Sequence, residues 1–263
     1  MSPQLTAYQD RAARLDTADL DFAEFERHPL EDDALRCLRY MHDVENHTVC
    51  YLRDLLLTAA HKDPGITSFL TFWNFEEFWH GEAIASVLAA HGENGRERVT
   101  AMRHRLGWKD RLGPVAHLTG SALAGESFIA VHMTWGAINE WSTQAGYARL
   151  AARARHPLLS ELLQRIMRQE GRHIDFYASQ ARQRLDADPR ARRLTRFALK
   201  RFWKPVGATV MPPPEVRFLI QYLFGGTDGQ AVARRIDRRI DALPGMSGLA
   251  LVDNARQAHA DAA

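Results

Sequence analysis

Glutamate and histidine recur with the same spacing in two distant parts of the 263-residue chain. Glu77 and His80 stand three positions apart, and so do Glu170 and His173. Residues with this spacing lie on one face of an α-helix, so each pair can address the same ion. Because carboxylate oxygen and imidazole nitrogen are both common metal ligands, the pairs predict two matching halves of one metal site.

One further glutamate precedes each pair at a similar distance along the chain. Glu45 stands 32 residues before Glu77, and Glu140 stands 30 residues before Glu170. All these residues interrupt apolar stripes whose 4-3-4-3 spacing is typical of the interior face of a helical bundle. The six predicted metal ligands are therefore Glu45, Glu77, His80, Glu140, Glu170 and His173.

The charge of four interior carboxylates gives the reason for a metal. Ionised carboxylates in an apolar interior are costly unless cations compensate them, and the four stripes contain no lysine or arginine. Two divalent ions would balance the charge, and bridging carboxylates hold such ions about 3.5–4 Å apart. Mixed oxygen and imidazole ligands suit iron or manganese better than zinc. We expect two iron ions, with manganese as the alternative at one or both positions.

Four long helices must position these ligands, and the sequence predicts them at about 31–61, 66–91, 125–153 and 157–185. Pro64 and Gly65 separate the first two helices, and Pro157 suits the first turn of the fourth. Short loops make two hairpins, and a longer connection, about 92–124, joins them. One long crossover is typical of a ferritin-like four-helix bundle, so we expect an all-α fold.

The remaining sequence suits one domain over residues 1–263, with the ligand-bearing bundle at about 31–185. A C-terminal extension at about 187–242 is expected to form two or three shorter helices. The net charge of +2 gives no overall electrostatic case for binding nucleic acid. Cys37 and Cys50 form no CxxC pair, which disfavours a thiolate zinc site. We expect a cytoplasmic protein with no membrane span and no signal peptide.

The residues around the ligands resemble the soluble acyl-carrier-protein desaturases, a branch of the ferritin-like di-iron carboxylate superfamily. The segment 76–82, EEFWHGE, is similar to the EENRHG segment of that family, and Trp73 matches a family tryptophan. The segment 170–173, EGRH, is similar to the EKRH segment of the family. Thr143 matches a family threonine one turn after the third ligand, Glu140. The resemblance covers about residues 30–185.

Four positions depart from the pattern of the family. Phe78 and Trp79 replace a polar pair, Gly171 replaces a lysine, and Gln169 replaces an acidic residue. Outer residues of this kind orient histidine ligands, so the changes could alter reactivity. With Gln169 neutral, we expect another carboxylate or a backbone group to hold His173. The candidates are Asp175 and Asp43.

The resemblance implies a di-iron oxidase that uses O2 and two electrons to introduce a double bond into an acyl chain. It also implies an acyl-carrier protein that presents the chain, a ferredoxin-type electron donor and a homodimeric enzyme. Thr143 would deliver protons near the ions, or it would simply be a small residue that leaves room for the ligand. These two interpretations of Thr143 stay open.

Other features allow two interpretations. The segment 189–204 has seven basic residues and no acidic one, so it predicts either a docking face for an acidic carrier or a solvated helix face. His42 and His132 lie near the ligand turns, and we favour core histidines or outer partners of the ligands over additional ligands. A group of aromatic residues would line an acyl tunnel or fill the core: Phe69, Phe72, Phe75, Phe128 and Trp135.

Three other functions compete with desaturation. A related di-iron oxygenase, a hydroxylase or an N-oxygenase, would act on a different metabolite and would fit the altered outer residues. A ferritin-like iron-storage protein is disfavoured by two complete Glu–His half-sites and a long C-terminal extension. A helical interaction protein without metal is disfavoured by the buried charge.

Overall fold

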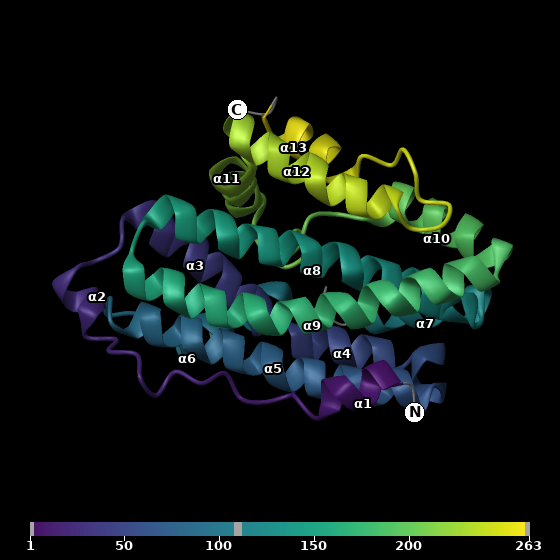
Figure 1. Ribbon diagram of the computed structural model, residues 1–263, viewed down its shortest axis with the longest axis horizontal. Helices are drawn as coiled ribbons and strands as arrows, with labels where there is room; N and C mark the ends of the chain where they lie inside the picture. Colours follow the sequence, from purple (N-terminus) through teal and green to yellow (C-terminus); the bar gives the residue numbers. More distant parts are fainter. Residues whose placement is uncertain (1–2, 108–111, 261–263) are drawn as a thin grey trace.

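The computed structural model describes residues 3–107 and 112–260. In these ranges every regular element is a helix, and the longest helices lie side by side as a bundle (Figure 1). The bundle consists of α3 (Asp32–Glu45) with α4 (Thr48–Leu56), α5 (Pro64–Ala89), α8 (Ser127–Ala154) and α9 (Pro157–Ala187). Three predicted helices, at about 66–91, 125–153 and 157–185, are confirmed to within two residues at each end.

Local hydrogen bonds fix where the bundle helices begin. The carboxylate of Asp63 accepts from the amides of Gly65 and Ile66, which otherwise have no partner within α5. His156 caps α9 in the same way, because its ring accepts from the amide of Leu159. A proline in the first turn of each helix supplies a suitable φ angle. These caps set the register of the ligands on both helices.

The first predicted helix, about 31–61, is wrong as a single element. α3 ends at Glu45, α4 begins at Thr48, and a short 3₁₀-helix, η1 (Ala59–Lys62), follows. Side chains compete with the helical backbone at the break: Asn46 donates to the carbonyl of His42, and Thr48 donates to that of Glu45. Because of this break, the apolar spacing expected to continue along one interior face after Glu45 is lost on α4, where Val49 is 46% exposed.

Shorter helices surround the bundle. The crossover contains α6 (Gly95–Leu106) and α7 (Leu112–Ala124). The range 187–242 contains three helices, within the two or three expected: α10 (Pro189–Phe202), α11 (Pro213–Phe224) and α12 (Gly226–Asp241). A fourth, α13 (Leu251–Ala260), follows beyond the predicted range. In Figure 1 these four lie along one side of α8, and α1 (Pro3–Gln9) lies beside α5 on the opposite side. α2 (Glu24–Arg27) lies between α1 and the first bundle helix, α3, along the chain.

None of the helices in the described ranges combines the length and the apolar content that crossing a membrane would require. The core follows the bundle axis and continues beneath α10–α13, where Leu199, Ile220 and Ile240 are at most 4% exposed. The C-terminal helices therefore pack on the bundle through apolar side chains.

Close packing between α8 and α9 depends on Gly136. A β-carbon at this position would overlap the ring of Tyr177, which is fully buried. We expect Gly136→Ala to lower the free energy of unfolding by about 1–3 kcal/mol, the usual effect of overpacking a core. Urea denaturation of the metal-free protein measures this change.

Gly171→Ala on α9 is the matched control for this prediction. Its new methyl group would meet only the side-chain amide of Gln144, at 3.8 Å. Alanine favours a helix interior by about 0.5–1 kcal/mol over glycine, so this variant should be slightly more stable. Equal losses in the two variants would contradict the packing argument.

Candidate metal centre

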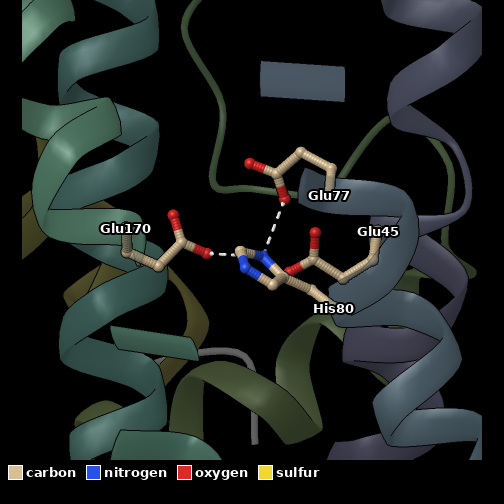
Figure 2. A group of neighbouring side chains, drawn as sticks. All are labelled: Glu45, Glu77, His80 and Glu170. Carbon is tan, nitrogen blue, oxygen red and sulfur yellow. Dashed lines mark ion pairs between the residues drawn. The ribbon is translucent and has the colours of Figure 1, made fainter. Parts of the chain in front are cut away.

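The six residues that the sequence predicts as ligands meet inside the bundle. Glu45 lies at the end of α3, Glu77 and His80 lie on α5, and the other three lie on α8 and α9. All six side chains are buried, and the most exposed of the residues, Glu140, is only 6% exposed. Figure 2 shows four of them pointing toward one another from three different helices.

Two overlapping groups among the described residues have the arrangement of a metal site. One consists of Glu45, Glu77, His80 and Glu170, and the other of Glu77, Glu140, Glu170 and His173. Within each group, one ligand atom from every residue lies within 4.8 Å of the others. Glu77 and Glu170 belong to both groups, which is the position of bridging carboxylates between two ions. The donor set is therefore able to bind two metal ions.

Both histidines turn the same ring nitrogen toward the carboxylates. Nδ1 of His80 lies 3.4 Å from Glu77 and 3.5 Å from Glu170. Nδ1 of His173 lies 3.1 Å from each of the same two glutamates. The two imidazoles thus present equivalent donor atoms to the shared carboxylates.

Two buried polar atoms in this cluster lack a hydrogen-bond partner among the described residues and could both be ligands of a cation. Nδ1 of His80 and Oε1 of Glu170 are shielded from solvent, and neither has a hydrogen-bond partner in the described part of the chain. Buried polar groups are rarely left unpaired. A metal ion between them would satisfy both atoms.

Without metal, protons must balance the charge of the cluster. Burial, and then the neighbouring Glu77, raise the pKa of Glu45. Burial, and then Glu170, raise the pKa of Glu140. Burial alone would lower the pKa of His80, but the nearby carboxylates of Glu170 and Glu77 raise that pKa to about 9. Protons on these groups occupy the place that metal ions would take.

Glu76 holds His173 from the outside. Its Oε2 lies 2.8 Å from Nε2 of His173 and accepts a hydrogen bond from the hydroxyl of Tyr8, also at 2.8 Å. Arg172 donates to its other oxygen at 2.5 Å. A carboxylate other than residue 169 thus holds His173, as expected, but the two named candidates are wrong: Asp175 is exposed, and Asp43 pairs with Arg98.

Gln169 holds His80 in the equivalent position. Its Oε1 lies 2.8 Å from Nε2 of His80, and its Nε2 donates to the carbonyl of Ala13 at 2.9 Å. The amide of Ala13 in turn donates to Glu76. A glutamine can accept and donate at once, whereas an ionised carboxylate can only accept. The departure from the family pattern therefore ties the N-terminal segment to the layer behind both histidines.

Two aromatic residues complete the contacts of the carboxylates. Trp73 donates from Nε1 to Glu140 at 2.9 Å, and the hydroxyl of Tyr147 donates to Glu45. The other departures lie farther out: Phe78 is 47% exposed, and Trp79 packs under the guanidinium of Arg14. Trp73 matches a tryptophan of the resembling family, whereas no motif in the sequence indicates the contact of Tyr147.

An apolar cavity of about 1250 Å³ reaches the cluster at Glu77 and Glu140. Phe128 and Trp135, two of the predicted tunnel aromatics, line it. A second, smaller cavity of about 70 Å³ adjoins Glu45. Thr143 lines both cavities, one turn after Glu140 on α8.

The other aromatic candidates do not share one role. Phe69 is fully buried and stacks on Phe176, with ring centroids 3.9 Å apart. Phe72 packs against the core, and Phe75 is 44% exposed. The two candidate histidines differ as well, since His42 contacts Asp43 and His132 contacts Tyr51. Of the two, His132 lines the large cavity.

The shared carboxylates should affect metal content more than the unshared ones. We expect Glu77→Ala to lose both ions, because Glu77 belongs to both groups, and Glu45→Ala to keep about one ion per chain. Elemental analysis of purified protein reconstituted with iron and manganese gives the ratio. Equal metal content in the two variants would contradict the bridging arrangement.

The stability gained from metal should rise with pH. His80 has a folded pKa of about 9, above its ordinary value of 6.5, so its contribution to the metal-free fold is lost as pH rises between these values. The raised pKa values of Glu45 and Glu140 act in the same direction. Metal ions replace the lost protons, so the difference in Tm between loaded and metal-free protein should grow from pH 6.5 to 9. A constant or shrinking difference would show that protons and metals do not compete here.

No protein-family model matches this sequence, and neither does any curated protein. Solved structures of R2-like ligand-binding oxidases do match its fold. A tyrosine-to-phenylalanine variant with an aerobically reconstituted Mn/Fe cofactor has a TM-score of 0.60 and 17% identity, over 97% of this chain and 93% of that chain. A valine-to-leucine variant with an anaerobically reconstituted Mn/Fe cofactor gives 0.61 and 16%, with the same coverage. These likenesses confirm the predicted all-α, ferritin-like fold, and they do not single out the desaturases.

Proposed function

We propose that this chain is an O2-dependent di-metal oxidoreductase that oxidises an apolar substrate. The observation that carries the proposal is the pair of ligand groups joined through Glu77 and Glu170, which opens on a large apolar cavity. The ions would be two irons, or iron with manganese, as in the Mn/Fe cofactor of the matching oxidases. Bound in this way and reduced, such a pair activates dioxygen for attack on an unactivated C–H bond.

The chain itself would position the ions, exclude water from them and control the transfer of protons beside them. The six ligands are buried, so the ions would lie away from bulk water and in a medium of low polarity. Glu76 and Gln169 fix the orientation of the two imidazoles. Thr143 lies between the two cavities, where its hydroxyl can hold or pass a proton beside Glu140.

The volume and lining of the large cavity suit a long hydrocarbon chain. Apolar atoms dominate its wall, and such walls bind acyl chains by removing them from water. The specific form of the proposal is desaturation. The acyl chain loses two hydrogens, and O2 is reduced to two molecules of water by these hydrogens together with two further electrons and two protons. A carrier-bound acyl substrate, a ferredoxin-type donor and a homodimer remain predictions from the sequence resemblance.

A second candidate is hydroxylation or N-oxygenation of a substrate with a polar group. The hydroxyl of Tyr177 and Nε2 of His132 are buried, line the large cavity and have no hydrogen-bond partner in the described part of the chain. The hydroxyl of Tyr51 lies 2.7 Å from Nδ1 of His132, and burial lowers the pKa of His132 to about 3, so the ring is neutral. With Tyr51 donating to Nδ1, Nε2 carries a hydrogen that could bind a substrate oxygen.

Mass analysis of the product tests the function and separates its two forms. Reduced, metal-loaded protein given O2 and an acyl substrate, either free or on acyl-carrier protein, should consume O2 and form product. Loss of two hydrogens indicates desaturation, and gain of one oxygen indicates hydroxylation. Glu77→Ala is the control without metal. If the reduced, metal-loaded protein consumes no O2 with acyl chains of any length, the proposal is contradicted.

Thr143→Val is expected to lower the rate of product formation by roughly 100-fold if the hydroxyl transfers a proton. Valine keeps the size and branching of threonine, so metal content should stay unchanged. Thr134→Val is a matched control on α8, because Thr134 is fully buried and donates only to the carbonyl of Ala130. A normal rate in Thr143→Val would show that the hydroxyl is not needed and that Thr143 only leaves room for the ligand Glu140.

A further inference from the structure

The large cavity reaches the surface between α7 and α10. Three apolar residues of its lining are also strongly exposed: Leu123 of α7 is 78% exposed, and Phe197 and Phe202 of α10 are 59% and 56% exposed. The guanidinium of Arg190 on α10 donates to the carbonyl of Leu123 at 3.4 Å, which joins the two helices at this point. The mouth of the cavity therefore has an apolar rim.

Exposed apolar residues concentrate on the two helices that border this mouth. Among the described residues, eleven large apolar residues are exposed, and six of them lie on α7 and α10. Leu118 and Val115, about one and two turns before Leu123 on α7, are 54% and 58% exposed. Single exposed apolar residues are common, but a cluster of this kind marks an interaction surface. We call the cluster the rim patch: Val115, Leu118, Leu123, Phe197 and Phe202.

Basic residues accompany the rim patch. Arg190, Arg193 and Lys204 line the same cavity and are exposed. Arg193 and Lys204 form no ion pair with a carboxylate in the described part of the chain, and the segment 189–204 has no acidic residue of its own. The face around the mouth thus combines unpaired positive charge with apolar side chains.

We propose that the rim patch and its basic residues dock on an anionic lipid surface. Helices that insert into the boundary of a bilayer combine large apolar side chains with lysine and arginine, as α10 does. The cations would contact lipid phosphates while Phe197, Phe202 and Leu123 enter the acyl layer. The entrance of the cavity would then face the bilayer, and an acyl chain could pass between them without crossing water.

Two other occupants fit the patch less well. A second copy of the chain related by a two-fold axis would bring the basic segment 189–204 close to itself, and like charges would repel. An acidic carrier protein would satisfy the basic residues, but it would leave the apolar rim without an apolar medium. A lipid surface with negative head groups satisfies both features. Docking stands by itself, whereas delivery of an acyl chain rests on the proposed function.

Vesicle sedimentation of the metal-loaded protein tests the proposal. We expect binding to vesicles of phosphatidylcholine with phosphatidylglycerol, weaker binding at high salt, and little binding to phosphatidylcholine alone. The double variant Phe197→Ser, Phe202→Ser should bind at least about ten-fold more weakly, because these exposed rings would no longer enter the lipid. The double variant Arg193→Gln, Lys204→Gln should bind about 25-fold more weakly, since each cation near the surface contributes about five-fold.

A matched charge control comes from α12. Arg238 and Arg239 are exposed, but no large apolar residue of α12 is exposed with them. Arg238→Gln with Arg239→Gln removes the same charge and should change vesicle binding by less than about two-fold. All the substitutions lie on the surface, and unchanged thermal unfolding would show that the fold is retained.

Three results would overturn the docking proposal. They are equal binding to neutral and anionic vesicles, a complex with acyl-carrier protein in place of vesicle binding, and a dimer in gel filtration that the two phenylalanine substitutions dissociate. The proposed function is tested separately. Glu77→Ala should bind vesicles normally while it lacks metal, and the patch variants should keep normal metal content.

Discussion

The organisation of this protein depends on four carboxylates that share an interior with only two imidazoles. Four negative charges in a dry bundle cannot persist without protons or cations, because burial penalises each charged form. The raised pKa values of Glu45 and Glu140 show where protons go when no metal is bound. The groups that surround the cluster then follow from one requirement, which is to hold six side chains in an arrangement that two ions can stabilise.

The outer hydrogen bonds connect this requirement to the rest of the chain. Glu76 and Gln169 each hold one imidazole, and Ala13 joins them by donating to the first and accepting from the second. The N-terminal segment therefore closes the side of the bundle at α5 and α9, although it supplies none of the six predicted ligands. The large cavity reaches Glu77 and Glu140 of the cluster, and residues of α8 and α10 line it. Access to the centre is thus restricted on one side and wide on the other.

The sequence alone predicts that the two Glu–His pairs face one interior cluster, because the spacing within each pair is local. Glu77 with His80, and Glu170 with His173, are set by the geometry of one helical turn. The partner of His173 is a different case: Asp175 is close in sequence, but the group that holds the ring comes from α5 across the bundle. The break after Glu45 was missed because it depends on two side-chain hydrogen bonds with no periodic pattern. Such contacts arise only once helices are placed against one another.

The departures from the desaturase pattern affect the surroundings of the two candidate metal positions to different degrees. Phe78 is exposed, and it leaves the set of donor atoms unchanged. Gln169 places a neutral amide behind His80, whereas Glu76 places a carboxylate behind His173. A carboxylate partner makes an imidazole a stronger donor than an amide partner does. Two ligand groups with identical residue types therefore form positions of different electronic character, and this difference gives the chain a physical means to treat two metal ions unequally.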